Sequence, residues 1–258
     1  MSNPTTIIGL DLAWSTRNRS GAAALRGTAA GGALLGPPEL LSDDTAILAY
    51  VQRHAPIGPA IVAIDAPLRV PNLTGRRPAE AALAAAFRAY EAGPLPANRQ
   101  LLARNGTVRG EDLVARLGEL GFTYSDHIAA NEARRVVVEI FPHPAMIAIF
   151  GLARTLKYKL KPGRTRATRL QAWRDYQAHL RALAQADPPL QFDLALLEVD
   201  LAGLGPSALK GYEDRIDALF CAYIGLYACR WGATRCQTFG SLEEGSIFTP
   251  VPDSSDSL

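Results

Sequence analysis

Acidic residues stand where apolar runs of the sequence end. Asp11 interrupts the run that begins at Thr6, and Asp65 follows Ile61-Val62-Ala63-Ile64. Glu139 follows a third run, of three valines. Asp is disfavoured in strands and costly to bury without a partner, so repeated acids at expected strand ends indicate a nearby cation. Carboxylate oxygens without a neighbouring His or Cys cluster favour Mg²⁺ or Mn²⁺ over zinc.

A second pair of acids lies in an expected helix near the end of the chain. Asp214 and Asp217 are three residues apart and therefore share a helix face. The stripe continues through small residues at positions 218, 221, 222 and 225, which predicts a close approach to a sheet and directs Asp217 toward it. We predict one metal site in which Asp11, Asp65 and Asp217 are catalytic. The expected metal ligands are Asp11, Asp65, Glu139, Asp214 and Asp217.

The strand-end acids also have interpretations without a metal. Asp11 can cap the turn that follows its run, and Asp65 can form a turn before a proline. Glu139 can equally be a structural partner of Arg134 or Arg135. Each signal is weak when taken singly, whereas the acids together form the pattern of a carboxylate-lined metal site.

The helix acids have alternatives as well. Asp214 can be an acid favoured by the helix dipole, and Asp217 can pair with Arg215 or another base. If the carboxylates repel one another, Asp217→Asn should leave stability equal or higher, whereas the loss of a structural ion pair should lower it. His143 lies between two prolines, and we interpret it as a packed loop histidine rather than a base.

The elements that must position these residues alternate between strands and helices, which predicts an α/β fold with one mixed sheet. The chain of 258 residues is long enough for one sizeable core. We predict one domain over residues 1–250, with a helical insertion at about 67–135 and a helical region at about 150–206, followed by a flexible tail at 251–258. The expected strands are 6–13, 20–25, a broken strand within 33–41, 61–64, 136–138 and 245–249, and a capped helix begins near residue 44.

The net charge of +2 is too small to indicate a nucleic-acid partner by itself. Basic residues gather instead in one local block, from Arg154 to Arg169, that contains no acid. This block is either a solvated face or a surface that contacts phosphates, with Tyr158 and Trp173 available to stack bases. The candidate substrate-binding residues are Lys157, Lys159, Lys161, Arg164 and Arg166.

The cysteines indicate a reducing compartment. Cys221, Cys229 and Cys236 are odd in number, lack CxxC spacing and fall in or near a helical pattern, as core thiols do. The sequence also has no signal-peptide pattern and no apolar stretch of about 18 residues. We therefore expect a cytoplasmic protein without a membrane partner.

Four motifs, in order, resemble the landmarks of the DUF429 family. They are Gly9-Leu10-Asp11-Leu12-Ala13-Trp14, Ala63-Ile64-Asp65-Ala66-Pro67-Leu68, Glu139-Ile140-Phe141-Pro142-His143 and Asp214-Arg215-Ile216-Asp217-Ala218. That resemblance implies a nuclease with an RNase H-like fold, here a mixed five-stranded sheet flanked by helices. The last motif is also similar to that of RuvC-type Holliday-junction resolvases, which implies metal-binding roles for Asp11, Asp65, Asp214 and Asp217. Glu139 matches the DUF429 motif rather than the resolvase pattern.

The expected activity is hydrolysis of a nucleic-acid phosphodiester with Mg²⁺ or Mn²⁺, because two ions held by carboxylates can stabilise both the attacking and the leaving oxygen. An actin-like or sugar-kinase-like phosphotransferase is the enzyme alternative, although no glycine-rich phosphate turn follows Asp11. A binding module that keeps the fold and its carboxylates is the non-enzymatic alternative. RNA, DNA, a hybrid, a branched structure and a small phosphate ester all remain possible substrates.

Overall fold

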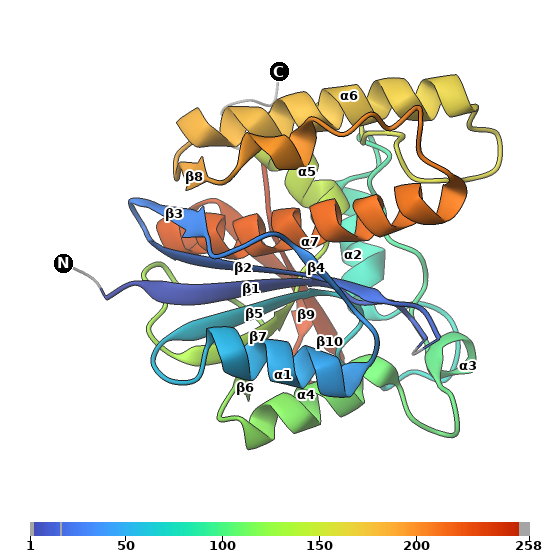
Figure 1. Ribbon diagram of the computed structural model, residues 1–258. Coiled ribbons are helices and arrows are strands. Elements are labelled where there is room, and N and C mark those ends of the chain that lie inside the picture. The colour runs from blue at the N-terminus through green and yellow to red at the C-terminus, as the bar shows by residue number, and fades with distance from the viewer. Residues whose placement is uncertain (1–2, 16, 253–258) are drawn as a thin grey trace.

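The computed structural model describes residues 3–15 and 17–252, which form a mixed α/β structure (Figure 1). A large sheet runs through its centre and helices cover both faces, while a two-stranded hairpin forms a second sheet. The strands of the large sheet are β1 (Thr5–Asp11), β2 (Ser20–Thr28), β3 (Gly31–Leu34), β4 (Glu39–Leu41), β5 (Ala60–Asp65), β6 (Thr123–Tyr124), β7 (Arg135–Glu139) and β8 (Leu190–Gln191). The hairpin consists of β9 (Cys236–Ser241) and β10 (Gly245–Pro250). The helices are α1 (Asp44–His54), α2 (Pro78–Ala86), α3 (Arg99–Leu102), α4 (Arg109–Glu119), α5 (Pro142–Phe150), α6 (Arg166–Ala182) and α7 (Pro206–Trp231), and short 3₁₀ turns cover Leu183–Gln185, Leu194–Leu197 and Gly232–Thr234.

The large sheet has the strand order β6-β7-β5-β1-β2-β3-β8, and β4 pairs with β2. Strands β1, β5 and β7 are parallel, whereas β2 is antiparallel to β1, β3 and β4. The expected meander and the crossover through α1 are thus confirmed. The expected count of five strands was wrong, because the described residues form eight strands in this sheet. The run expected as one broken strand makes both β3 and β4, and β6 and β8 have two residues each, too few to show a period in the sequence.

The two faces of the sheet carry separate parts of the core. Successive strand residues point to opposite faces, so Ile7 of β1 packs in the cluster that contains α7 and α6, whereas Ile8 packs in the cluster that contains α1 and α4. Figure 1 shows α7 directly against the sheet, with α6 as an outer layer beyond it. The continuous apolar run of β5 is buried on both faces, as the sequence predicts for a parallel strand.

Helix α7 approaches the sheet closely because glycines face it. A Cβ atom on Gly9 of β1 would lie 2.1 Å from the backbone nitrogen of Ala222, and one on Gly21 of β2 would lie 1.9 Å from the carbonyl oxygen of Asp214. A Cβ atom on Gly225 of α7 would lie 2.6 Å from the Cγ2 atom of Ile7. The predicted small-residue stripe is therefore a contact surface, and it fixes the helix acids against the ends of β1 and β2.

The remaining segments complete the frame. Helix α1 begins where the sequence predicts, because the Asp43 side chain accepts a hydrogen bond from the Ala46 amide at 2.9 Å. The expected helical insertion contains α2, α3 and α4 together with β6, and α2 packs against β9 and β10. All three cysteines are buried and free, as expected for core thiols.

The expected tail begins with two residues without regular structure, and its residues 253–258 lie outside the described residues. Among the helices that the structure describes, none has the length and apolar character needed to cross a bilayer.

Candidate active site

Asp11 and Asp65 lie side by side at the same edge of the sheet. They are the last residues of β1 and β5 and are direct partners in the register of these parallel strands. On the next strand, Glu139 ends β7 and pairs with Ile64. The prediction that Asp11 and Asp65 occupy adjacent strands is confirmed. Three neighbouring strands thus deliver one acid each to one edge, because the carboxyl ends of parallel strands meet there.

A pocket of about 910 Å³ opens over this edge. It is lined by Asp11, Asp65 and Glu139 from the sheet and by Asp214 from α7. The cationic residues around it are Arg17, Arg19, Arg77, Lys159, Lys161 and Lys210. The volume lies within the range usual for small-ligand sites. One cavity therefore brings four of the five predicted ligands next to a comparable number of positive charges.

The fifth predicted ligand, Asp217, lies beneath the pocket in an interaction of its own. Its side chain is fully buried, and its Oδ1 atom accepts hydrogen bonds from the hydroxyls of Tyr158 at 2.8 Å and Tyr176 at 3.4 Å. Its Oδ2 atom is 2.9 Å from the ammonium nitrogen of Lys159, in an ion pair that lacks hydrogen-bond geometry. Asp217 is thus paired with a base, as the alternative interpretation allowed, but the base is Lys159 rather than Arg215.

Asp214 has a lysine partner on its own helix. Lys210 lies one turn earlier in α7, and its ammonium is 2.7 Å from Asp214 and 2.7 Å from Glu213. The spacing of three and four residues is the one that brings side chains together on a helix. Asp214 and Lys210 both line the pocket, so their charges face it as a pair.

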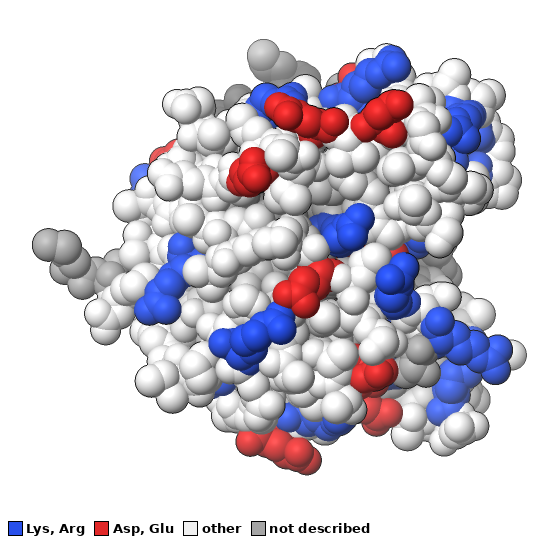
Figure 2. All heavy atoms as spheres, viewed as in Figure 1, with Lys and Arg blue, Asp and Glu red and all other residues white. Residues whose placement is uncertain are grey.

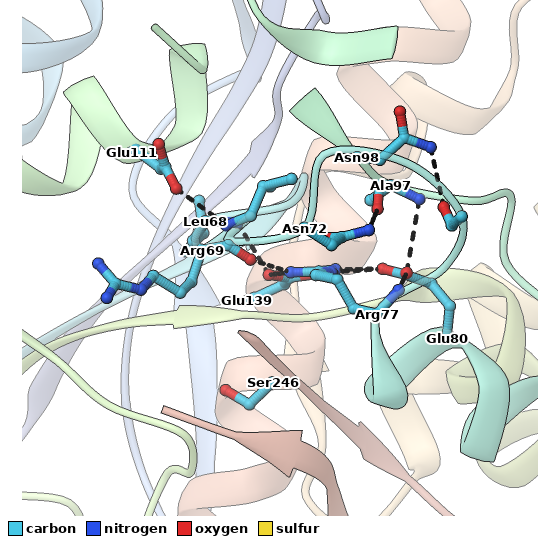
Figure 3. Close-up of polar contacts among 12 residues, drawn as sticks. Leu68, Arg69, Asn72, Arg77, Glu80, Ala97, Asn98, Glu111, Glu139 and Ser246 are labelled. Carbon is cyan, nitrogen blue, oxygen red and sulfur yellow. Dashed lines mark hydrogen bonds and ion pairs between the residues drawn. The ribbon is translucent and has the colours of Figure 1, made fainter. Parts of the chain in front are cut away.

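Glu139 belongs to a buried ion-pair network (Figure 3). Its carboxylate receives two hydrogen bonds from Arg77, at 3.0 and 2.5 Å, and one from the Leu68 amide at 2.8 Å. Arg77 also pairs with Glu80 at 2.5 Å and donates to the carbonyl of Arg69. Figure 3 shows the guanidinium held between the two carboxylates. Burial raises the pKa of Glu139 despite this partner.

Glu139 is thus a structural ion-pair partner, as the alternative interpretation allowed, but of Arg77 rather than Arg134 or Arg135. Arg134 forms its ion pair with Glu132 at 2.6 Å, and Arg135 donates to backbone carbonyls while it lies over the ring of Phe122. Both arginines precede or begin β7, at the end of the strand opposite to Glu139. A strand of five residues separates its ends by more than a side chain can span.

The basic block forms a loop that leads into α6, and most of its charges make local contacts. Lys157 and Arg154 pair with Glu91. Arg164 donates to the Lys159 carbonyl at 3.0 Å, and Arg166 donates to the Ala202 carbonyl at 2.7 Å. Of the five candidate substrate-binding residues, Lys159 and Lys161 line the pocket. On the face shown in Figure 2, positive and negative side chains are interspersed rather than gathered in a basic band.

The aromatic residues expected to stack bases are not accessible. Tyr158 and Trp173 are both fully buried, and their rings contact each other at a centroid distance of 4.8 Å. The expectation that they stack on nucleic acid was therefore wrong. Tyr158 instead anchors the basic loop to α7 through its bond to Asp217, which places the neighbouring Lys159 at the carboxylates.

The charges of the site are strongly coupled. Burial raises the pKa of Asp11 well above its ordinary value, and the neighbouring carboxylates of Asp217 and Asp65 raise it further while Lys159 opposes them. Burial likewise raises the pKa of Asp65 to about 7, again against the attraction of Lys159. Burial alone would lower the pKa of Lys159, but Asp217, Asp11 and Asp65 outweigh it and raise that pKa. Lys159 is thus the cation that most strongly opposes the raised pKa values of Asp11 and Asp65.

His143 lines the same pocket from the start of α5. Burial, followed by the nearby charges of Lys159 and Lys161, lowers its pKa well below the ordinary value. Its Nδ1 atom lies 3.3 Å from the Thr155 hydroxyl. His143 is therefore a neutral, partly packed residue, in keeping with its interpretation as a packed histidine.

A preformed metal cluster is absent from the part of the chain that the structure describes, since no three His, Cys, Asp or Glu side chains there are placed to hold an ion. The physical reason is that Arg77 and Lys159 engage Glu139 and Asp217. Sequence reasoning missed Arg77 and Lys210 as site residues. The spacing of Lys210 from Asp214 could have revealed that pair, whereas nothing local marks Arg77 as buried.

The comparisons with known proteins identify a family but no activity. The family model for DUF429, described as a protein of unknown function, matches residues 9–240. Neither the curated proteins nor the solved structures contain a significant match. The matched range includes the four motifs with their acids at positions 11, 65, 139, 214 and 217. The chain therefore belongs to the DUF429 family.

Proposed function

We propose that the pocket is the active site of a Mg²⁺- or Mn²⁺-dependent phosphodiesterase that acts on nucleic acid, with Asp11 and Asp65 as the primary metal ligands. The observation that carries this proposal is the direct pairing of Asp11 and Asp65, which both line the pocket. Desolvation raises the pKa of both Asp11 and Asp65, and a divalent cation shared by these carboxylates would stabilise their charged forms. The meander continued by parallel strands supports the finer assignment of an RNase H-like sheet.

The donor set fits a hard cation bound by few protein ligands. Mg²⁺ is commonly held by one or two carboxylates, with water and substrate phosphate oxygens completing its shell. Asp11 and Asp65 supply the two carboxylates, whereas the Oδ2 atom of Asp217 is engaged by the ammonium of Lys159 at 2.9 Å. A bound ion would activate a water molecule and neutralise charge on the phosphodiester.

The position of Lys159 changes the expectation that the carboxylates hold two metal ions. Its ammonium interacts with Asp11, Asp65 and Asp217 and is drawn to the carboxylates. We assign it the role of a fixed positive charge that supplies part of what a second ion would provide, in contact with Asp217. Lys161 lines the pocket without a carboxylate partner among the described residues and is suited to orient a phosphate. Lys157, Arg164 and Arg166 then act indirectly, by holding the loop that presents both lysines.

Hydrolysis assays with matched variants test this proposal. The purified chain would be incubated with bis(p-nitrophenyl) phosphate and with single-stranded and duplex oligonucleotides, in Mn²⁺, Mg²⁺ or EDTA. We expect metal-dependent turnover that falls by roughly 100-fold or more in Asp11→Asn and Asp65→Asn. The control is Asp175→Asn, because Asp175 is exposed on α6 and contacts Gln171 rather than the pocket. Turnover that survives in Asp11→Asn, or that is equal in EDTA, would overturn the proposal.

A metal-independent binding module is the second candidate. The ion pair between Lys159 and Asp217 favours it, because this lysine already neutralises part of the carboxylate charge without a metal. The same experiment separates the two candidates. Oligonucleotide binding in EDTA together with no turnover in any metal would support the binding module, whereas turnover that requires Asp11 and a divalent ion excludes it.

A further inference from the structure

An exposed tryptophan stands at the pocket, three residues after Asp11. Trp14 is 56% exposed and lines the cavity. The other two tryptophans are engaged elsewhere: Trp173 is fully buried, and the Trp231 indole donates to the Asp187 carbonyl at 3.0 Å. No ring contact, cation–π contact or hydrogen bond joins Trp14 to another residue within 3–15 and 17–252. An indole left open to solvent at a cavity mouth is a large apolar surface without an internal partner.

The backbone beside this tryptophan is braced from two sides. The Ala13 amide donates to the Ser20 hydroxyl at 3.2 Å, and the Ala13 carbonyl accepts from the Arg109 guanidinium at 2.5 Å. Arg109 is itself paired with Asp44 at 2.7 Å. These contacts hold the backbone immediately before Trp14 at the edge of the pocket. A fixed backbone reduces the conformational freedom that is lost when a planar ligand stacks on the indole.

The charges near Trp14 complement an anion. Arg17 and Arg19 follow it in the same loop and line the pocket, and Lys161 and Lys210 line the pocket from other elements. Within the described residues, Arg17, Arg19 and Lys161 form no ion pair with a carboxylate, in contrast to Lys210. One cavity thus combines an open aromatic face, unneutralised cations and the carboxylate pair. A nucleotide presents the matching groups, an aromatic base and a phosphate.

We propose that Trp14 forms a nucleobase-stacking subsite at the pocket, so that the ligand is a nucleotide or the unpaired end of a nucleic-acid strand. The face of a base inside a duplex is covered by its neighbours, whereas an unpaired base can lie flat on the indole. A cavity of about 910 Å³ is large enough to hold a nucleotide. This inference rests on the proposed function for the role of the phosphate, and the stacking contact itself requires no metal.

Ligand binding in EDTA tests the subsite apart from catalysis. Affinities would be measured by calorimetry for adenosine 5′-monophosphate, for ribose 5-phosphate as the ligand without a base, and for single-stranded and duplex oligonucleotides. We expect the mononucleotide to bind more tightly than ribose 5-phosphate and to quench tryptophan fluorescence. Trp14→Ala should weaken nucleotide binding by about 5- to 100-fold and leave ribose 5-phosphate binding unchanged, since stacking is lost and the cations remain.

Two further variants test whether the loss of affinity comes from the aromatic face of Trp14. Trp14→Phe, which keeps an aromatic face, should retain part of the affinity, and Leu73→Ala, which removes a 71% exposed apolar side chain that does not line the pocket, should change nothing. Equal binding of the base-containing and base-free phosphates, no binding of either, tighter binding of duplex, or unchanged affinity in Trp14→Ala would each overturn the subsite. A different result would overturn the proposed phosphodiesterase function, namely turnover that does not depend on Asp11 or on a divalent ion.

Discussion

The stability of the variant Asp217→Asn shows which of two roles Asp217 has. It is either a structural ion-pair partner or a carboxylate that is destabilised by repulsion from its acidic neighbours. Mutual repulsion of the acids predicts, from the sequence, that this variant is as stable as the wild type or more so. The structure reverses that expectation, because Asp217 is fully buried and pairs with Lys159 at 2.9 Å. An asparagine keeps an oxygen to accept the hydrogen bond from Tyr158, so the change removes mainly the charge.

The size of the effect follows from what remains unpaired. Removing one partner of a buried ion pair costs about 3–5 kcal/mol, because the other charge is left without compensation. Here the side chain of Lys159 is 23% exposed, and its ammonium keeps the attraction of Asp11 and Asp65. We therefore expect a loss of about 2–3 kcal/mol in the free energy of unfolding. For a chain of this size the melting temperature should fall by roughly 5–10 °C.

The companion substitution Asp65→Asn should move stability in the opposite direction. Burial raises the pKa of Asp65 from 3.8 to about 7, so the folded state loses stability as pH rises through this interval. Above about pH 7 the wild type bears the whole penalty, which an asparagine removes. Because the attraction of Lys159 and Lys210 offsets part of this penalty, we expect a gain of about 1–2 kcal/mol.

Urea unfolding in EDTA near pH 8 measures both changes. Asp175→Asn is the control, because this exposed carboxylate should alter stability by no more than about 0.5 kcal/mol. The double variant Asp217→Asn/Lys159→Met should recover part of the loss, because it removes the stranded ammonium. If Asp217→Asn unfolds at the same urea concentration as the wild type or at a higher one, Asp217 is not a structural partner of Lys159 and the reasoning fails.

Three further outcomes follow from other parts of the fold. Arg77→Met should lower the free energy of unfolding by about 3–5 kcal/mol, because it leaves the buried Glu139 unpaired, and adding Glu139→Gln should restore part of it in urea titrations. Gly9→Ala should destabilise the protein by about 3 kcal/mol or more, since the new methyl would overlap the α7 backbone, and a melting temperature within a few degrees of the wild type would contradict that packing. Glu132, whose pKa falls to about 2 because its hydrogen bonds to Arg134 outweigh its burial, should contribute stability that is present above about pH 4.5 and lost as pH falls toward 2. Glu132→Gln should therefore be about 1–2 kcal/mol less stable than the wild type near pH 7 but nearly equal to it near pH 2, and a difference that is independent of pH would refute the assignment.

Local patterns in the sequence predict the central parallel strands and the packing of α7. The apolar runs that end at Asp11, Asp65 and Glu139 form β1, β5 and β7, because short continuous runs joined by crossovers favour buried parallel strands. Parallel neighbours have their carboxyl ends at one edge, so the pairing of Asp11 with Asp65 was predictable. The helical spacing of Asp214 and Asp217 and the small residues after them likewise predicted the close approach of α7.

The partners of these acids were decided by the tertiary structure alone. Arg77 reaches Glu139 across 62 residues of sequence, and Tyr158 reaches Asp217 across 59. A periodic pattern reports which face of an element is buried, but it carries no information on which distant side chain meets it there. For that reason local patterns predict where the carboxylates gather but not which side chains meet them. Only the folded chain determined that Lys159 and Arg77 neutralise two of them and leave Asp11 and Asp65 facing the pocket.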